Sequence, residues 1–305
     1  MYELMIIGGG PAGLTAAVYA ARKKLNAVML SGDIGGQVNT TWGVENYMGY
    51  QFIQGPELMA KFQAQMEKFP IEQKVGYIIS SLKKIMGGFE AVTEEGDKYQ
   101  AKVVVYATGK SPRKLNVPGE AEFTGKGVAY CATCDGPIFS GKKVAVVGGG
   151  NSALEAALDM VKIAKHVDLV SLTPLTGDPV LIDKLSSAKK LSLFTEYQTE
   201  KIEGDKFVNG MQIKSLKGNK EQSLDVAGIF IEIGLVPNSG PVSKLVELND
   251  NGEVMVDCGC RTSVPGIYAA GDVTSVPEKQ IVIAAGEGAK AALQAHRYLQ
   301  RQKPS

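Results

Sequence analysis

Cysteine, histidine and long apolar runs are scarce in this sequence. Its 305 residues include 4 Cys and 2 His, far too few for the disulfide framework of a secreted scaffold. No run of about 18 apolar residues occurs, and the chain enters the segment MYELMIIGGG without a basic leader. We therefore expect a soluble, cytoplasmic protein that does not insert into a membrane.

An excess of charge of either sign is also missing. The chain carries 33 Lys and Arg against 32 Asp and Glu, and 44% of its residues are apolar. This balance argues against an intrinsically disordered chain and against a strongly basic nucleic-acid binder. At about 100–200 residues per domain, the length predicts about two domains.

Glycine is abundant, and its first cluster has an informative context. The apolar run at 4–7 predicts a short strand, residues 8–13 read GGGPAG, and an alanine-rich segment that favours a helix follows. Strand, glycine turn and helix in this order form the dinucleotide-binding fingerprint. In that fingerprint Gly8 makes the tight turn, Gly10 admits a pyrophosphate, and Gly13 allows close packing of helix and strand. The predicted cofactor-binding turn also includes Pro11 and Ala12.

The same pattern returns later in the chain. The apolar run at 143–147 leads into GGGNSA at 148–153 and another segment that favours a helix. Between the two turns, residues 101–108 read as a buried strand. A last strand at 266–270 is followed by an alanine-rich helix from about residue 280.

This order predicts an α/β fold with two Rossmann-like dinucleotide-binding domains of the three-layer ββα type, the second inserted into the first. We expect residues 1–113 and 245–305 to form one discontinuous domain and residues 114–244 to form the inserted domain. The expected joints, at 112–118 and 241–246, each contain Pro and adjoin a Gly, and segments with Pro and Gly are typical of exposed linkers.

The segment CATCDG at 131–136 is the sharpest chemical signal. Two cysteines separated by two residues near a helix N-terminus gain thiolate character and can close a redox-active disulfide. We therefore predict Cys131 and Cys134 as catalytic, with Asp135 as a proton donor to the leaving thiolate. The alternatives are half of a zinc site or two inert thiols. Zinc would need a second ligand pair, and the other thiols form only the CxC of Cys258 and Cys260, so we expect no metal.

In their order along the chain, these motifs resemble those of bacterial low-molecular-weight thioredoxin reductases, and the resemblance covers essentially the whole chain. The C-terminal half is also similar to the reductase portion of the alkyl hydroperoxide reductase flavoprotein. That flavoprotein has an extra N-terminal disulfide-relay region that this sequence lacks, which favours a thioredoxin reductase. The matching motifs are Gly8–Gly13, Gly35-Gly36-Gln37, Val44–Tyr47, Ala107–Gly109, Cys131–Gly136, Gly148–Ala153, Gly271–Val273 and Lys279-Gln280.

The resemblance implies FAD in the discontinuous domain, a homodimer, and thioredoxin or a thioredoxin-like protein as partner. It implies that Cys134 faces the flavin, that Cys131 attacks the disulfide of the partner, and that the inserted domain rotates about the two joints. Ser31 to Gln37 would lie along the adenosine, and Asn46 near the flavin. The implied FAD site comprises Gly8, Gly10, Pro11, Ala12, Gly13, Ser31, Gly35, Gly36, Gln37, Asn46, Thr108, Gly109, Gly271, Asp272, Lys279, Gln280 and Ile281.

The second glycine turn departs from the family. NADPH-dependent members carry His and Arg at the following strand end to bind the 2′-phosphate, whereas residues 170–177 here read VSLTPLTG. NADPH is therefore not expected as the donor, and Ser171 stands where an NADH enzyme usually has an acid. Three alternatives stay open: NADH bound loosely, another donor such as ferredoxin, or an Asp178 that folds back onto the turn. The residues of this degenerate nucleotide site are Gly148, Gly150, Asn151, Ser152 and Ser171.

The sequence thus predicts an FAD-dependent thioredoxin-disulfide reductase. One alternative is a reductase of a peroxiredoxin system. The other is a non-catalytic flavin- or nucleotide-binding redox sensor, against which the intact CxxC and Asp135 argue. Trp42 either stacks near the flavin or packs in an ordinary loop, and we interpret Cys258 and Cys260 as structural or incidental.

Overall fold

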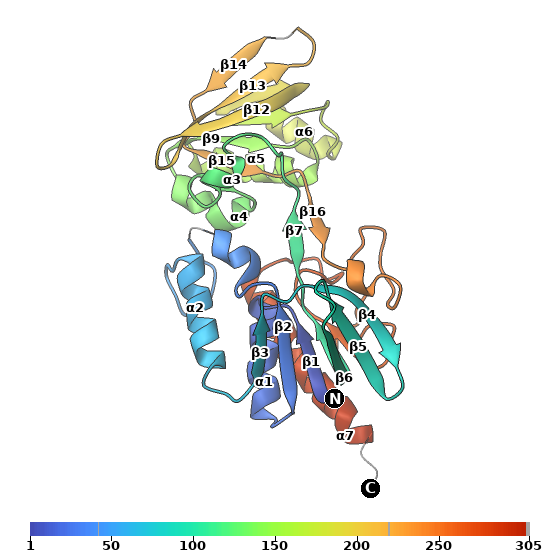
Figure 1. Cartoon of the computed structure of the whole chain (residues 1–305). Helices are drawn as coiled ribbons and strands as arrows, with labels where there is room; N and C mark the ends of the chain where they lie inside the picture. The colour runs from blue at the N-terminus through green and yellow to red at the C-terminus, as the bar shows by residue number, and fades with distance from the viewer. Residues whose placement is uncertain (42, 219, 303–305) are drawn as a thin grey trace.

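The computed structural model describes residues 1–41, 43–218 and 220–302. Trp42 lies outside these described residues, and both interpretations of it stay predictions. Two bodies are stacked end to end and joined by a narrow connection of two strands (Figure 1). The chain leaves the first body, builds the second, and returns to finish the first with a long C-terminal helix.

The first body is built on a seven-stranded sheet with the order β3-β2-β1-β6-β5-β4, in which β17 also pairs with β6. Strand β1 lies between β2 and β6 and runs parallel to both. Its residues 4–7 are buried, as expected of an apolar parallel strand covered on both faces. Strands β4, β5 and β6 form an antiparallel meander. The strands are β1 (Tyr2–Ile7), β2 (Ala27–Ser31), β3 (Glu72–Val75), β4 (Ile79–Ile85), β5 (Gly88–Thr93), β6 (Lys98–Tyr106) and β17 (Ile267–Ala269).

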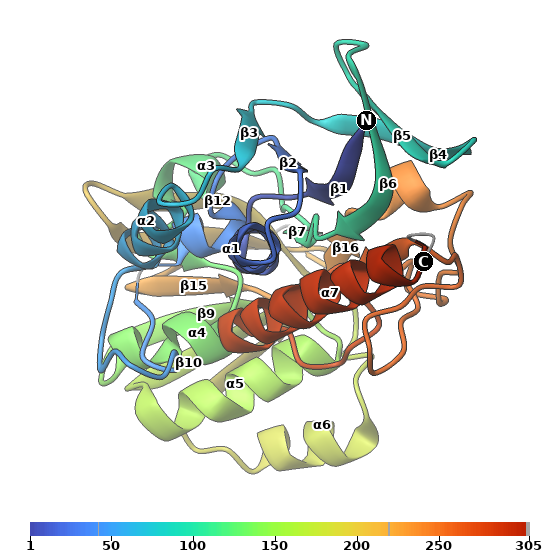
Figure 2. The same ribbon diagram turned by 90° about the horizontal axis from the view of Figure 1, so that it is seen from below.

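Three helices pack on one face of this sheet, seen from below in Figure 2. The first begins at Pro11, which suits an initial helical turn because it has no N–H group to satisfy. Its contact with the C-terminal helix is close, since a Cβ on Gly288 would overlap the carbonyl oxygen of Ala12. No helix in the described ranges is both long and apolar enough to cross a membrane. The helices are α1 (Pro11–Arg22), α2 (Gly55–Met66) and α7 (Ile281–Gln302), with the 3₁₀ helices η1 (Gly36–Thr40) and η3 (Gly240–Val242).

The second body repeats the same layers. Its five-stranded parallel sheet has the order β11-β10-β9-β15-β8, with helices on one face and an antiparallel sheet of β12, β13 and β14 on the other. In the first body the antiparallel strands continue the parallel sheet and pack over its face opposite the helices. Helices, parallel strands and antiparallel strands thus form three layers in both bodies, which confirms the predicted fold class. The parallel strands are β8 (Val128–Ala129), β9 (Lys143–Val147), β10 (His166–Ser171), β11 (Leu191–Thr195) and β15 (Gly228–Ile231). The other elements are β12 (Tyr197–Gly204), β13 (Val208–Ser215), β14 (Glu221–Leu224), α3 (Glu120–Phe123), α4 (Ala132–Asp135), α5 (Asn151–Ile163), α6 (Pro179–Ser186) and η2 (Gly136–Phe139).

The connection between the bodies is the antiparallel pair of β7 (Lys110–Pro112) and β16 (Leu235–Pro237). Directly after β16, the backbone oxygen of Asn238 accepts hydrogen bonds from the hydroxyl groups of Tyr106 and Thr108, at 2.7 and 2.9 Å. Val242 packs in the core of the first body, ahead of the predicted boundary at 244/245. The boundaries at 113/114 and 244/245 stay predictions.

Candidate active site

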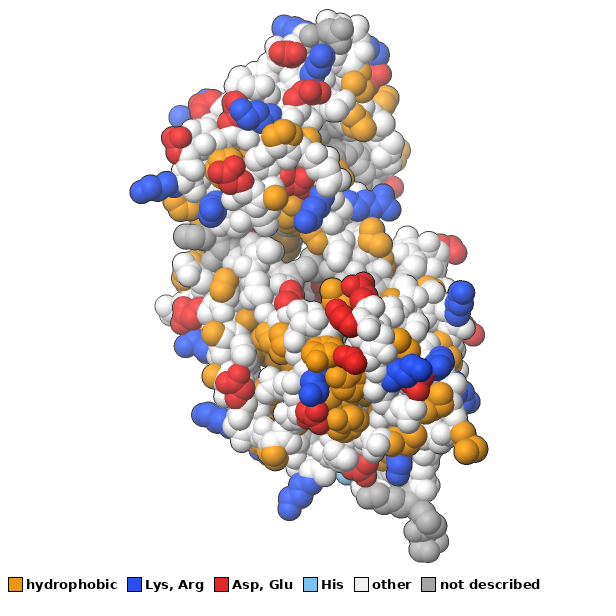
Figure 3. All heavy atoms as spheres, in the orientation of Figure 1, with side chains coloured by type: hydrophobic (Ala, Val, Ile, Leu, Met, Phe, Trp, Pro, Cys, Tyr) orange, Lys and Arg blue, Asp and Glu red, His pale blue; other side chains and the backbone are white. Residues whose placement is uncertain are grey.

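A cavity of about 1270 Å³ lies between the two bodies. The first glycine turn lines it from one body, and the segment of Cys131 and Cys134 lines it from the other. The volume exceeds the roughly 300–1,000 Å³ of an ordinary small-ligand pocket, as an extended ligand such as a dinucleotide requires. Charges of both signs are interspersed on the face of the molecule that Figure 3 shows.

The first glycine turn has the geometry of a cofactor cradle. Gly8 has a φ of +117°, and a Cβ there would overlap the carbonyl oxygen of Ala107. A Cβ on Gly13 would overlap the carbonyl oxygen of Gly8, so the third glycine serves the close packing of helix and turn. Gly10 differs, because a Cβ there would meet no atom within 4 Å and would enter the cavity. The turn therefore fits a pyrophosphate at the N-terminus of α1.

The other residues of the implied FAD site converge on the same cavity. All of them line it, although they come from five separate stretches of the chain, at 31–37, 46, 108–109, 271–272 and 279–281. In the first turn itself, Gly13 is the one predicted residue that does not line the cavity. The side chain of Asn46 donates a hydrogen bond to Gln280 Oε1 at 3.0 Å and so ties two of these stretches together. At the end of β2, Ser31 Oγ donates to the backbone oxygen of Asp33 at 2.5 Å. The residues present thus fit FAD.

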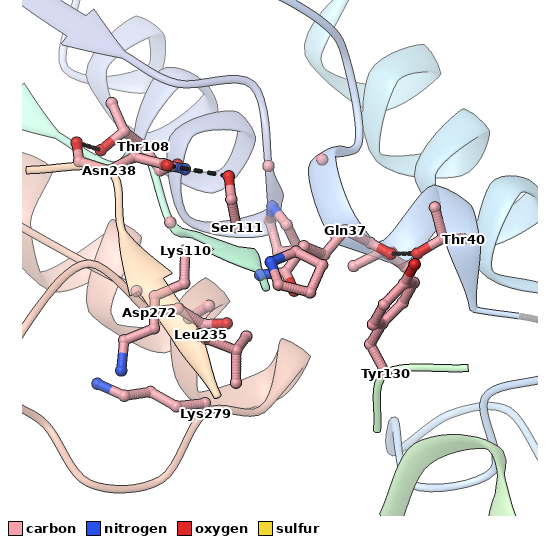
Figure 4. A pocket seen from close by; sticks show the side chains of 18 of the residues that line it. Gln37, Thr40, Thr108, Lys110, Ser111, Tyr130, Leu235, Asn238, Asp272 and Lys279 are labelled. Carbon is pink, nitrogen blue, oxygen red and sulfur yellow. Dashed lines mark hydrogen bonds between the residues drawn. The ribbon is translucent and has the colours of Figure 1, made fainter. Parts of the chain in front are cut away.

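A group of charged side chains lies at one end of the cavity, and Figure 4 shows two of its lysines beside Asp272. Glu253 accepts hydrogen bonds from Lys110 at 2.6 Å and Lys279 at 3.2 Å. Burial raises the pKa of the Asp272 carboxyl, while the two lysines oppose that rise. Burial and the nearby Lys110 lower the pKa of Lys279, and Glu253 partly compensates.

Cys131 and Cys134 form a disulfide in the structure, with their Cα atoms 5.3 Å apart. Cys131 is the N-cap of α4, and its sulfur accepts a hydrogen bond from the backbone N–H of Cys134 at 3.2 Å. Asp135 ends the same helix and is buried. All three predicted catalytic residues line the cavity that contains the first glycine turn. Among the described residues, no group of three or more His, Cys, Asp or Glu is arranged to hold a metal ion.

The second glycine turn lies elsewhere, and Ser152 alone of its predicted residues lines the cavity. The segment after β10 folds back over this turn, because the backbone N–H of Thr176 donates to the carbonyl oxygen of Gly149 at 2.8 Å. Asp178 also lies against this turn, and its part in binding a donor stays a prediction. Its carboxylate accepts a hydrogen bond from the Asn151 amide at 3.1 Å.

Comparison with known proteins places the chain in a family. Residues 2–288 match the pyridine nucleotide-disulphide oxidoreductase family. The chain belongs to this family. Thioredoxin reductase from Streptococcus pyogenes is 38% identical, with a TM-score of 0.93 and 99% of each chain covered. Thioredoxin reductase from Giardia duodenalis is 34% identical, with a TM-score of 0.90, and the match covers 98% of this chain and 99% of that one.

A curated relative of this oxidoreductase is the F component of the alkyl hydroperoxide reductase of Staphylococcus aureus. The two are 42% identical over 301 residues, which cover 98% of this chain and 59% of the relative. The chain thus spans 59% of the length of that relative. The family and the two solved structures confirm the resemblance to thioredoxin reductases and the prediction of an oxidoreductase.

The structure also adds residues to the site of this oxidoreductase that the motifs did not predict. Lys110, Tyr130, Leu235 and Glu232 line the cavity, and Glu253 pairs with two of its lysines. Glu232 follows the buried strand β15, and an ionisable residue at the carboxyl end of a parallel strand is a usable signal for a site. The pair of Lys110 and Glu253 has no such signal, because it joins residues from distant parts of the chain.

Proposed function

We propose that this oxidoreductase is an FAD-dependent disulfide reductase that reduces thioredoxin or a thioredoxin-like protein through Cys131 and Cys134. One observation carries the proposal: the disulfide and the first glycine turn open into the same cavity. FAD, when bound, supplies two-electron chemistry that links an electron donor to the disulfide. The predicted homodimer, the cytoplasmic location and the rotation about the joints at 112–118 and 241–246 belong to the same proposal.

The residues of the cavity would divide the work among them. The turn at 8–13 would hold the pyrophosphate, and the segment from Asp272 to Ile281 would border the isoalloxazine. Cys134 would face the flavin, and Cys131 would attack the disulfide of the protein substrate. Asp135 would give a proton to the thiolate that leaves.

The proposed donor is NADH or a non-pyridine donor such as ferredoxin, and not NADPH. No Lys, Arg or His occurs at 170–177, where a 2′-phosphate would need cations. Asp178 instead presents a carboxylate beside the second turn. Anaerobic titration of the FAD-loaded protein with NADH, NADPH and reduced ferredoxin tests this directly. Bleaching of the flavin by micromolar NADPH would refute the donor assignment.

The second candidate is a reductase for a peroxiredoxin, which the 42% identity to the F component of alkyl hydroperoxide reductase favours. Turnover assays with purified thioredoxin and purified peroxiredoxin, each with the donor that bleaches the flavin, separate the two candidates. Direct reduction of thioredoxin with at least about tenfold higher kcat/KM supports the first candidate. A reduced flavin that passes no electrons to the disulfide of Cys131 and Cys134 would return the chain to the alternative of a redox sensor.

A further inference from the structure

Glu232 is an ionisable residue beside the disulfide that the proposed reaction has not used. It follows strand β15, whose register pairs Ile229 with Val128 and Phe230 with Ala129 of β8. Continued by two residues, this register brings Glu232 level with Cys131. The backbone N–H of Glu232 donates to the carbonyl oxygen of Val147 at 2.8 Å, which fixes its backbone at the carboxyl end of the parallel strands.

The carboxylate of Glu232 contacts the helix that carries the dithiol. Its Oε1 atom accepts a hydrogen bond from the backbone N–H of Ala132 at 3.2 Å. Another N–H group of this short helix, that of Cys134, donates to the sulfur of Cys131 at 3.2 Å. The Glu232 carboxylate and the Cys131 sulfur therefore accept hydrogen bonds from two different N–H groups of the same helical turn. When both are ionised, they are like charges at the same site.

We propose that Glu232 is an acid–base residue that shares one proton with Cys131 when the disulfide is open. The proposal goes beyond the role of Asp135, because Glu232 acts on the thiol of this chain and not on the thiolate that leaves the protein substrate.

Burial supports this assignment, since it raises the pKa of Glu232 to about 7 despite the opposing hydrogen bond from Ala132. A carboxyl that titrates near neutrality can hold and release a proton under working conditions. The ionisable groups that line the same cavity from this body are Tyr130 beside Cys131, Cys134 and Asp135 on α4, and Glu155 and Asp159 on α5. Lys114, just after β7, also lines it, and Arg113 lies against Gly234, two residues after Glu232.

The proton balance of the proposed step is simple. Two electrons open the bond between the sulfur atoms of Cys131 and Cys134, and each sulfur then takes one proton. The proton on Cys131 comes from neutral Glu232, and the proton on Cys134 comes from water. When Cys131 attacks a disulfide of the protein substrate, Glu232 takes its proton back and the sulfur attacks as a thiolate. The source of the two electrons rests on the proposed function, whereas the shared proton does not.

The test measures the reactivity of one thiol. Full-length Cys134→Ser protein is reduced with dithiothreitol and freed of it, and the rate of alkylation of Cys131 by iodoacetamide is followed by peptide mass spectrometry from pH 5 to pH 10. The same series is recorded with Glu232→Gln added, which removes the charge and keeps an oxygen that can accept from Ala132. Glu232→Leu is a second variant, and Glu155→Gln is the control for the loss of an exposed carboxylate in the same cavity.

We expect the ratio of the Glu232→Gln rate to the parent rate to depend on pH. It is about 1 at pH 5, where Glu232 is neutral, and rises to about three- to tenfold near pH 8, where a carboxylate opposes thiolate formation by roughly half to one pKa unit. It returns to about 1 near pH 10, where Cys131 is ionised in both proteins. Glu232→Leu follows the same curve, and Glu155→Gln stays near 1.

A ratio that does not vary with pH would overturn the proposal, because a purely structural effect of Glu232 changes reactivity equally at all pH values. The same rise in Glu155→Gln would also overturn it, since the effect would then be general repulsion in the cavity. The assay uses a chemical reductant and no protein substrate. Failure here therefore leaves the reductase proposal standing, and failure of the reductase proposal leaves this result unaffected.

Discussion

Asn151 and Asp178 bind each other through two hydrogen bonds. The amide of Asn151 donates to the Asp178 carboxylate at 3.1 Å, and the backbone N–H of Asp178 donates to Asn151 Oδ1 at 2.7 Å. Asn151 is the first residue of α5, where the phosphates of a nucleotide would meet the helix N-terminus. The pair therefore holds the Asp178 carboxylate at a helix N-terminus that would otherwise attract the phosphates of a nucleotide. This contact bears on which electron donor can bind at the second glycine turn.

The first prediction concerns cations at this site. We expect the double substitution Leu172→Arg and Thr173→Arg to strengthen NADPH binding at least about tenfold, because charge-assisted hydrogen bonds to a phosphate contribute roughly 1.5–3 kcal/mol. Both side chains are exposed, so the fold tolerates the change. Anaerobic flavin bleaching by NADPH, or equilibrium binding of NADPH, measures the gain.

The matched control is Leu216→Arg, which adds an arginine at an exposed leucine after β13. This variant should bind NADPH as weakly as the parent. Equal gains in both variants would mean that general charge, and not the second turn, attracts the nucleotide.

The second prediction concerns the disulfide. Cys134→Ser should leave a flavin that the donor still reduces and lower turnover of the protein substrate by at least about 10³-fold, because the relay of electrons has lost one sulfur. Cys258→Ser, which removes an exposed thiol outside the cavity, is the control and should keep full turnover. Unchanged turnover in Cys134→Ser would end the reductase proposal.

The third prediction separates two glycines of one turn. Gly10→Ala should leave the free energy of unfolding of the flavin-free protein nearly unchanged, because its Cβ enters open space, yet reduce FAD affinity by at least about tenfold. Gly13→Ala should cost about 1–3 kcal/mol of stability, because its Cβ overlaps the backbone of Gly8. Urea unfolding and the flavin content after reconstitution measure the two effects. Equal behaviour of the two variants would contradict this division of roles.

Local patterns explain how much of the site could be predicted. The turn at 8–13 and the dithiol at 131–134 are short segments whose chemistry depends on neighbours in sequence, so spacing alone identifies them. The contact of Glu232 with Ala132 depends on the pairing of β15 with β8, an order that no local pattern specifies. The same holds for the return of the chain through β16, which pairs with β7 only in three dimensions.

The last prediction concerns Glu253 and its two lysines. The bonds from Lys110 and Asn249 hold the pKa of Glu253 below its ordinary value of 4.5, although burial opposes them. A carboxyl with a lowered pKa stabilises the folded protein above its unfolded pKa, and this contribution is lost as the pH falls through the folded pKa. Glu253→Gln should therefore cost about 1–3 kcal/mol at pH 7, since it removes a charged partner from two half-buried lysines, and the loss should shrink as the pH falls through the folded pKa of Glu253. Urea unfolding of the flavin-free proteins at a series of pH values from about 7 down to about 3 measures this. Glu221→Gln, which removes the exposed partner of Lys214, should cost less than about 1 kcal/mol throughout the series. A loss in Glu253→Gln that stays constant over the whole series would show that packing, and not the ion pair, sets the contribution of this residue.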